Sequence, residues 1–275
     1  MSFISSGSTA GLSYLGSDAG QGLPIVLLHG IGSNAQSFVP LMQALASHYS
    51  TLAWDAPGYG NSQELPQEWP DASDYALALE RLLAATGVSR CVVVGHSLGA
   101  LIAARYAVSF PLQVMALVLI SPALGYGAEK HAPLPPPVAK RIEELDRLGP
   151  AAFSRARSPG LLADPAARPD VLQTVQQAMA AVRRPGYDQA ARLLAVGRLV
   201  EDAAKMTVPT AVLVGLQDRI TPPAHVRRAF DGLLAAQERL YREFDHAGHA
   251  ICLEQPALVA DAIAELIGSK AAVHA

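Results

Sequence analysis

Residues 91–100 read Cys-Val-Val-Val-Gly-His-Ser-Leu-Gly-Ala, and the fold of this chain follows from them. The apolar run at the start is typical of a buried strand, and the alanine-rich segment after Gly99 is typical of a helix. The G-x-S-x-G motif between them is common by chance, but in this context it indicates a sharp turn that exposes a serine hydroxyl. A plain helix-capping role for Ser97 would leave Gly95 and Gly99 unexplained. We therefore interpret Ser97 as a nucleophile.

Short apolar runs, each followed by a helix-length segment, recur along most of the chain. Runs without alternation suit strands that are buried on both faces of a parallel sheet. Strand and helix in turn predict an α/β fold, with a mostly parallel central sheet flanked by helices. We expect an antiparallel edge strand at Gly11–Gly16. The other predicted strands are Pro24–His29, Ser50–Trp54, Cys91–Gly95, Met115–Ser121, Pro209–Gly215 and Arg239–Asp245, and the predicted helices are roughly Ala35–His48, Asp71–Thr86, Ser97–Phe110, Pro223–Ala235 and Gln255–Ile267.

The segment 122–208 interrupts this alternation, because it has no strong strand run. Prolines 159, 165, 169 and 185 divide it into short helices, such as those around Arg141–Leu148 and Val171–Arg183. Ligands bind at the carboxyl ends of parallel strands, so an insertion there is expected to form a helical cap (lid) over the site. An extra helical layer without a role is the alternative. The predicted division is a core of residues 1–121 and 209–275 with a cap of residues 122–208.

Composition excludes several classes of protein. A hydrophobic fraction of 51% against 16% charged residues supports a sizeable core, and the net charge of −3 indicates no nucleic-acid partner. No apolar run reaches the ~20 residues that span a bilayer, and no Lys or Arg precedes an apolar stretch at Met1–Ser8, so we expect a cytoplasmic protein without membrane contact. Cys91 and Cys252 are expected to be buried and reduced rather than paired or metal-bound. The lack of a Gly-rich phosphate loop or paired His/Cys spacing predicts neither cofactor nor metal.

A serine hydroxyl is a poor nucleophile at neutral pH, so Ser97 needs a nearby base. His249 follows the last predicted strand and precedes the helix near Gln255, which places it at the same sheet edge as Ser97. The competing candidate is His246. It lies closer to the strand end, where a histidine is more often structural, and the Gly248 hinge favours His249.

The base in turn needs an orienting acid. Asp218 follows the predicted strand Pro209–Gly215, and the chain order Ser97, Asp218, His249 is the order that accompanies this motif. A surface turn or an ion pair with Arg219 is the alternative role for Asp218. The earlier strand end at Ser121-Pro122 has no carboxylate, which strengthens the assignment.

A tetrahedral oxyanion needs two backbone donors. One is expected to be the amide of Leu98, and the other the amide of Ile31 in the loop after the first parallel strand, with Gly32 as second choice. His29 in the same loop is interpreted as structural. Arg183-Arg184 are interpreted as part of a solvated helix face, although they would also suit steering of an anionic substrate.

Together these positions resemble the α/β-hydrolase superfamily over nearly the whole chain. The resemblance is carried by His-Gly-Ile-Gly at 29–32, Asp-Ala-Pro-Gly-Tyr-Gly at 55–60, Gly-His-Ser-Leu-Gly at 95–99, Asp218 and His249. Within the superfamily the chain is most similar to the 3-oxoadipate enol-lactonase and carboxylesterase branch, through 186–191 and 215–223. Ala100 differs, because that branch often has a further glycine there. The resemblance implies cofactor-free hydrolysis of a small-molecule ester or lactone through an acyl-enzyme.

Two other functions remain open at this point. Hydrolases of meta-cleavage products break carbon–carbon bonds with the same triad of serine, aspartate and histidine. Their oxyanion loop is usually longer and richer in Gly and Pro than the loop of residues 31–34 in this chain. A non-catalytic ligand-binding protein of this fold would be expected to lack a member of the triad. Haloalkane dehalogenases and epoxide hydrolases place an aspartate at the nucleophile position, and Ser97 argues against both.

Overall fold

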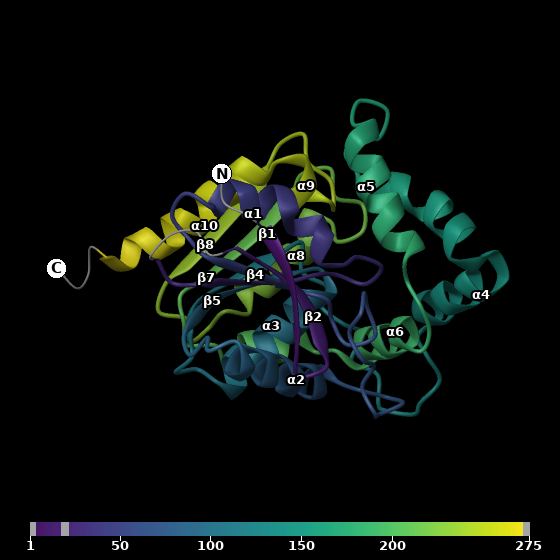
Figure 1. Ribbon diagram of the computed structural model, residues 1–275, viewed down its shortest axis with the longest axis horizontal. Helices are drawn as coiled ribbons and strands as arrows, with labels where there is room; N and C mark the ends of the chain where they lie inside the picture. Colours follow the sequence, from purple (N-terminus) through teal and green to yellow (C-terminus); the bar gives the residue numbers. More distant parts are fainter. Residues whose placement is uncertain (1–3, 18–21, 272–275) are drawn as a thin grey trace.

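The computed structural model describes residues 4–17 and 22–271, which form a twisted sheet flanked by helices (Figure 1). The core predicted from the sequence begins at residue 1 and ends at residue 275, and both of these residues lie outside the described ranges. The sheet has eight strands in the order β1-β2-β4-β3-β5-β6-β7-β8, of which β1 and β2 are antiparallel and the rest run parallel. This arrangement confirms the predicted α/β fold class. The strands are β1 (Ile4–Thr9), β2 (Leu12–Ser17), β3 (Ile25–Leu28), β4 (Thr51–Trp54), β5 (Cys91–His96), β6 (Val114–Ile120), β7 (Thr210–Gly215) and β8 (Arg239–Phe244).

The antiparallel part of the sheet differs from the expectation. The segment predicted as an edge strand is β2, and it pairs with β4 on its inner side and with β1 on its outer side. The edge strand is therefore β1, and the prediction that Gly11–Gly16 forms the edge was wrong. Strand β1 reads Ile-Ser-Ser-Gly-Ser-Thr and buries little, so it has no apolar run from which it could be predicted.

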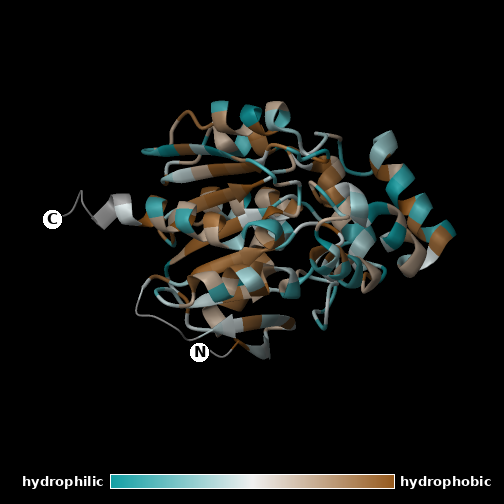
Figure 2. Ribbon diagram, turned by 90° about the horizontal axis from the view of Figure 1, so that it is seen from above, coloured by the Kyte–Doolittle hydropathy of each residue, from teal (hydrophilic) through white to brown (hydrophobic). Residues whose placement is uncertain are grey.

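Helices cover both faces of the sheet, and successive strand residues alternate between the two faces. Val26 and Leu28 belong to the apolar cluster that includes α2 (Ala72–Ala85), α3 (Leu98–Ser109) and α8 (Pro223–Asp231), whereas Ile25 and Leu27 belong to the cluster on the other face. That second layer comprises the 3-10 helix η1 (Ala35–Phe38) with α1 (Val39–Leu45), and α9 (Ile251–Glu254) with α10 (Pro256–Ala271). Figure 2 shows the apolar strands in the interior between these layers.

The segment 122–208 lies between β6 and β7 and is helical. Figure 1 shows α4, α5 and α6 standing to one side of the sheet. Helix α7 instead packs against α3 and α8. Among the described residues, no helix combines the length and apolar character that crossing a membrane requires. The elements are α4 (Pro136–Arg157), η2 (Ser158–Leu161), α5 (Pro169–Ala180), α6 (Gly186–Val196) and α7 (Leu199–Ala203).

The turn from β5 to α3 is the tightest part of the fold. Ser97 has φ 53° and ψ −114°, a backbone conformation that L-residues rarely adopt and that indicates stored strain. A Cβ on Gly95 would lie 2.5 Å from the carbonyl oxygen of Gly99, and a Cβ on Gly99 would overlap the carbonyl oxygen of Leu28. Both glycines of the motif are therefore required by close backbone approach.

Replacing Gly99 by Ala should lower the free energy of unfolding by about 2 kcal/mol or more, because the added methyl group overlaps the Leu28 carbonyl. Helix propensity alone would favour alanine by up to about 1 kcal/mol, so the two effects differ in sign. Urea denaturation measures the change. The matched control is Gly160→Ala, since nothing lies within 4 Å of a Cβ at that position. Equal stability of the two variants would contradict the close approach.

Candidate active site

The structure brings Ser97, Asp218 and His249 to the carboxyl-end edge of the sheet. Ser97 follows β5, Asp218 follows β7 and His249 follows β8, and these strands lie in the parallel part of the sheet. All three are buried, with exposed fractions of 6%, 3% and 4%. Burial strengthens the electrostatic interactions among these side chains.

A hydrogen bond of 2.9 Å joins His249 Nδ1 to Asp218 Oδ2. The other oxygen of Asp218 accepts from the backbone amides of Ile220 (2.8 Å) and Thr221 (2.9 Å). Burial opposes ionisation of Asp218, but His249 and these hydrogen bonds outweigh it and lower the pKa of the carboxyl to about 2. The ionised carboxylate holds the proton of the imidazole on Nδ1, which leaves Nε2 as the basic nitrogen.

The side chain of Thr221 lies beside Asp218 and His249, and it was not predicted from the sequence. Its hydroxyl lies 2.9 Å from Asp218 Oδ2, 3.0 Å from the carbonyl oxygen of Ser121 and 3.2 Å from His249 Nδ1. The hydroxyl has one proton, so it donates either to Asp218 Oδ2 or to the Ser121 carbonyl, because His249 Nδ1 carries a proton of its own. Its position three residues after Asp218 is the signal that could have revealed it, because Asp side chains often bond backbone amides two and three residues ahead.

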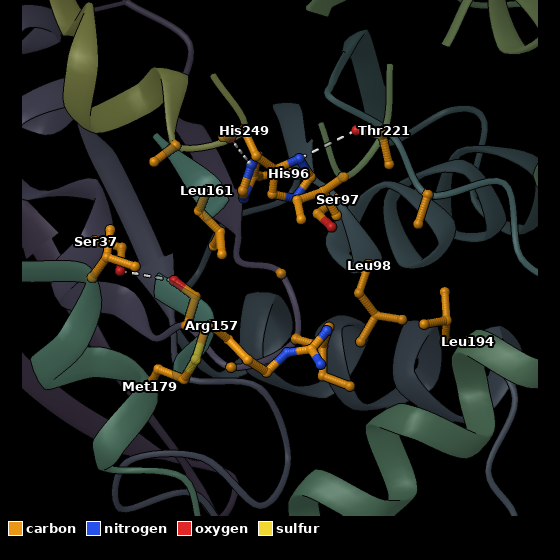
Figure 3. Close-up of a pocket in the computed structure, with 18 of the residues that line it drawn as sticks. Ser37, His96, Ser97, Leu98, Arg157, Leu161, Met179, Leu194, Thr221 and His249 are labelled. Carbon is orange, nitrogen blue, oxygen red and sulfur yellow. Dashed lines mark hydrogen bonds between the residues drawn. The ribbon is translucent and has the colours of Figure 1, made fainter. Parts of the chain in front are cut away.

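His96 stacks beside His249, as Figure 3 shows. The two ring centroids are 4.9 Å apart, and His96 Nε2 donates to the carbonyl oxygen of His249 across 2.8 Å. Burial and the neighbouring His249 lower the pKa of His96 to about 3, so this ring is neutral at physiological pH. His96 thus fixes the backbone of His249 without adding charge to the site.

The loop of His249 is also held by the inserted segment. Glu254 accepts from the amides of Gly248 and Ala163, each at 2.8 Å, and the amide of Ala250 donates to the carbonyl of Leu161 at 2.9 Å. A Cβ on Gly248 would lie within 3 Å of the backbone of residues 161–163. Residues 161–163 therefore lie directly on the loop that carries His249.

Ser97 and His249 line one cavity of about 660 Å³. Within the described part of the chain, the Ser97 hydroxyl makes no hydrogen bond with the His249 imidazole. Hydrolases without substrate often show this separation, and the contact tightens when substrate is bound. Core residues such as Phe38 and Thr221 share the cavity wall with Leu161, Val175 and Met179 of the inserted segment.

Leu98 and Ile31, whose amides are expected to hold an oxyanion, also line this cavity. Leu98 is the first residue of α3, so its N–H has no partner inside the helix. Ile31 lines the cavity beside Gly30, where a Cβ would lie 2.9 Å from the Cβ of Ser97. The second choice, Gly32, already donates to the hydroxyl of Tyr59 at 3.4 Å. The hydrogen bonding therefore favours Ile31 over Gly32.

The other residues named from the sequence lie away from the cavity or have a structural role. His246 has an 89% exposed side chain next to Asp245, which argues against it as the base. His29 is structural, since Nδ1 bonds the Gly30 carbonyl and Nε2 accepts from the amide of Ala56. Cys91 and Cys252 are free and buried. Within the described ranges, no three His, Cys, Asp or Glu residues are grouped to hold a metal ion.

The arginine pair 183–184 is exposed, as expected, but it lies in the turn before α6 and not on a helix. Arg183 donates to the backbone carbonyls of Gly60 and Ser62, so it joins the inserted segment to the core. Arg184 forms ion pairs with Asp146 and Asp188. Neither guanidinium lines the cavity.

Comparison with known proteins places the chain in a family. The model of the alpha/beta hydrolase family matches residues 25–262, so the chain belongs to this family and is a hydrolase. This result confirms the resemblance inferred from the motifs. A pimeloyl-[acyl-carrier protein] methyl ester esterase of Chromobacterium violaceum is 29% identical over 260 residues, which cover 92% of this chain and 97% of that protein.

Other similarities are either local or structural. A putative carbamate hydrolase of Escherichia coli is 32% identical over 97 residues, 35% of this chain and 36% of that protein. The enol-lactonase of Burkholderia xenovorans LB400 superposes with a TM-score of 0.82 at 20% identity, covering 96% of this chain and all of the other. An esterase of Exiguobacterium antarcticum gives 0.81 at 20% identity over 98% of this chain. The two structures share the fold with this chain.

The stability of the protein should depend on pH through His96. Its pKa lies at about 3 in the folded protein and at 6.5 when unperturbed. Between these values the unfolded chain binds more protons, so the free energy of unfolding should fall as the pH is lowered from about 6.5 towards 3. In His96→Gln this dependence should be weaker, which urea denaturation at pH 5 and pH 7 would measure. His29 adds to this pH dependence in both the wild type and the variant, since burial lowers the pKa of His29 as well. An unchanged pH dependence in the variant would contradict the assignment.

Proposed function

We propose that this chain is a cofactor-free serine hydrolase that cleaves a small ester or lactone, with Ser97, Asp218 and His249 as its triad. The observation that carries the proposal is the buried 2.9 Å hydrogen bond between His249 and Asp218, in a cavity that Ser97 also lines. The strained backbone at Ser97 supports a nucleophile, because such strain concentrates at functional sites.

The proposed reaction has two acyl-transfer steps. His249 Nε2 takes the proton of the Ser97 hydroxyl as the serine oxygen attacks the substrate carbonyl. The amides of Leu98 and Ile31 stabilise the oxyanion, an interaction worth about 3 kcal/mol per donor. His249 then protonates the leaving alcohol as the ester bond breaks. In the second step His249 activates a water molecule, which releases the acid and restores Ser97.

We further infer that segment 122–208 acts as a cap on a core formed by 1–121 and 209–275. Support comes from the cavity wall, to which Leu161, Val175, Met179 and Leu194 of this segment contribute alongside Ser97. Closing the cavity excludes water and strengthens each electrostatic interaction inside it.

The named relatives support ester or lactone chemistry rather than another hydrolysis. The esterase of Chromobacterium violaceum covers nearly the whole chain, and the structural neighbours include an enol-lactonase and esterases. These activities belong to the related proteins. For this chain they indicate which substrates to test first.

The nucleophile is tested by burst kinetics with p-nitrophenyl acetate and butyrate. The wild-type protein should show a burst followed by slower turnover, because an activated p-nitrophenyl ester acylates the serine faster than water removes the acyl group. Ser97→Ala should show neither, and Asp218→Asn should reduce kcat by about 10⁴-fold because the imidazole loses its correct tautomer. The matched control is Ser109→Ala, at the exposed end of α3, which should behave as wild type.

The result that would overturn this assignment is full turnover by Ser97→Ala. Absence of hydrolysis by the wild-type protein would contradict simple esterase activity. Diketones of the meta-cleavage type would then be assayed for carbon–carbon cleavage, and binding without any turnover would indicate a ligand-binding protein.

A further inference from the structure

Three residues of the inserted segment, 161–163, lie against the loop that carries His249, and we call them the clasp segment. The amide of Ala250 donates to the carbonyl of Leu161 at 2.9 Å. Figure 3 shows the Leu161 side chain on the His249 side of the cavity, whose wall both residues line. A Cβ on Gly248 would lie 2.6 Å from a backbone nitrogen of the clasp segment, closer than real Cβ atoms come. This close approach explains the glycine at 248.

The clasp segment is also bonded to the loop of Asp218. The guanidinium of Arg219, the next residue along the chain, donates to the backbone carbonyls of Leu162 (2.9 Å) and Ala163 (3.3 Å). The loops of Asp218 and His249 therefore touch the same three residues of the inserted segment. Their relative position depends on these contacts as well as on the hydrogen bond between the two side chains.

Apolar packing seats the clasp segment on the core. The side chain of Leu162 is fully buried and belongs to a small apolar cluster of its own. The cluster joins α5 of the inserted segment to the start of α9, and the other buried members are Val171, Val175, Ala250 and Leu253. Close-packed side chains transmit displacements to their neighbours. A shift of Leu162 is therefore felt at Ala250, the residue after His249.

Glu254 bonds the clasp segment to the core through its side chain, which is buried in α9. Its Oε2 accepts from the amide of Gly248 and its Oε1 from the amide of Ala163, each at 2.8 Å. Arg168, another residue of the inserted segment, donates to the backbone carbonyl of Glu254 at 3.0 Å. A carboxylate offers two acceptor oxygens and no donor, so one side chain satisfies both amides.

The two residues that flank His249 are thus both tied to the clasp segment. Gly248 is tied to it through Glu254, and Ala250 is bonded to Leu161 directly. A misplacement of about 1 Å in a reacting group can cost about 100-fold in rate. Small movements of the clasp segment therefore matter for a histidine that transfers protons.

We propose that the clasp segment sets the position of the His249 imidazole, and that Glu254 is the positioning residue through which it acts. This inference rests on the proposed function, in which His249 is the base. It gives the inserted segment a role in the proton transfers, because the imidazole is aligned with Asp218 only while the clasp segment is seated on the core.

Glu254→Gln tests this role with little change of shape. The glutamine keeps one acceptor oxygen, and its amide nitrogen faces the second backbone N–H, so one of the two hydrogen bonds is lost. With p-nitrophenyl butyrate, kcat should fall about tenfold or more because His249 is displaced, whereas KM should stay within about twofold of the wild-type value. Urea denaturation establishes that the variant is folded under the assay conditions.

The matched control is Glu265→Gln, which removes the same charge from an exposed side chain of α10 that bonds Arg242. It should keep the wild-type kcat and KM. A wild-type kcat in folded Glu254→Gln, or a change confined to KM, would overturn the positioning role and leave the proposed function intact.

A second variant reaches the clasp segment from its apolar side. Leu162→Ala removes atoms from the cluster and leaves Glu254 unchanged, so it should also lower kcat with little change in KM. Because both substitutions act through one contact, the double variant should lose less activity than the product of the two single losses. Losses that multiply would show that Leu162 and Glu254 act independently, and they would overturn the clasp.

A magnetic resonance measurement separates the clasp from catalysis. The proton on His249 Nδ1 should give a low-field resonance, because it is bonded to the Asp218 carboxylate, and its loss in Asp218→Ala assigns it. In Glu254→Gln and Leu162→Ala this resonance should move or broaden, whereas Glu265→Gln should keep the wild-type signal. If the wild-type protein hydrolyses no p-nitrophenyl ester, a displaced resonance would still support the clasp while the proposed hydrolysis fails. A resonance unchanged in both variants would overturn the clasp.

Discussion

The close contact between Gly99 and the Leu28 carbonyl determines the geometry of the rest of the site. It draws the start of α3 onto the end of β3, and the chain can reach that position only through the strained backbone of Ser97. The same approach brings Gly30, the neighbour of Ile31, against Ser97, and Leu98 is the first residue of α3. Backbone packing, without any special side chain, thus places the serine.

The partner of Ser97 is positioned by a different set of contacts. His249 is held at its ring by Asp218, at its carbonyl by His96, and at the neighbouring amides by Glu254 and Leu161. Three of these groups belong to the core and one to the inserted segment. Any movement of residues 161–163 would therefore move the loop of His249, so the inserted segment supports this loop and also forms part of the cavity wall.

The electrostatics of the site divide it into two regions. Near Ser97 the Asp218 carboxylate is ionised, whereas burial keeps His96 neutral. Across the cavity, Arg141 and Arg157 supply positive charge that Glu144 compensates only in part.

The sequence alone determined the features that depend on neighbouring residues. Residues 91–99 predicted the strand–turn–helix at Ser97 because its glycines and its flanking strand and helix are contiguous, and Asp218 and His249 were predicted as its partners because each follows a predicted strand. The polar β1, the structural partners of Arg183, and the roles of Thr221 and Glu254 came from the tertiary structure. His96 and His249 are 153 residues apart, and Arg141 and Tyr187 are 46 apart. No local pattern records such pairs, because only the packing of the inserted segment and the ordering of parallel strands bring them within hydrogen-bonding distance.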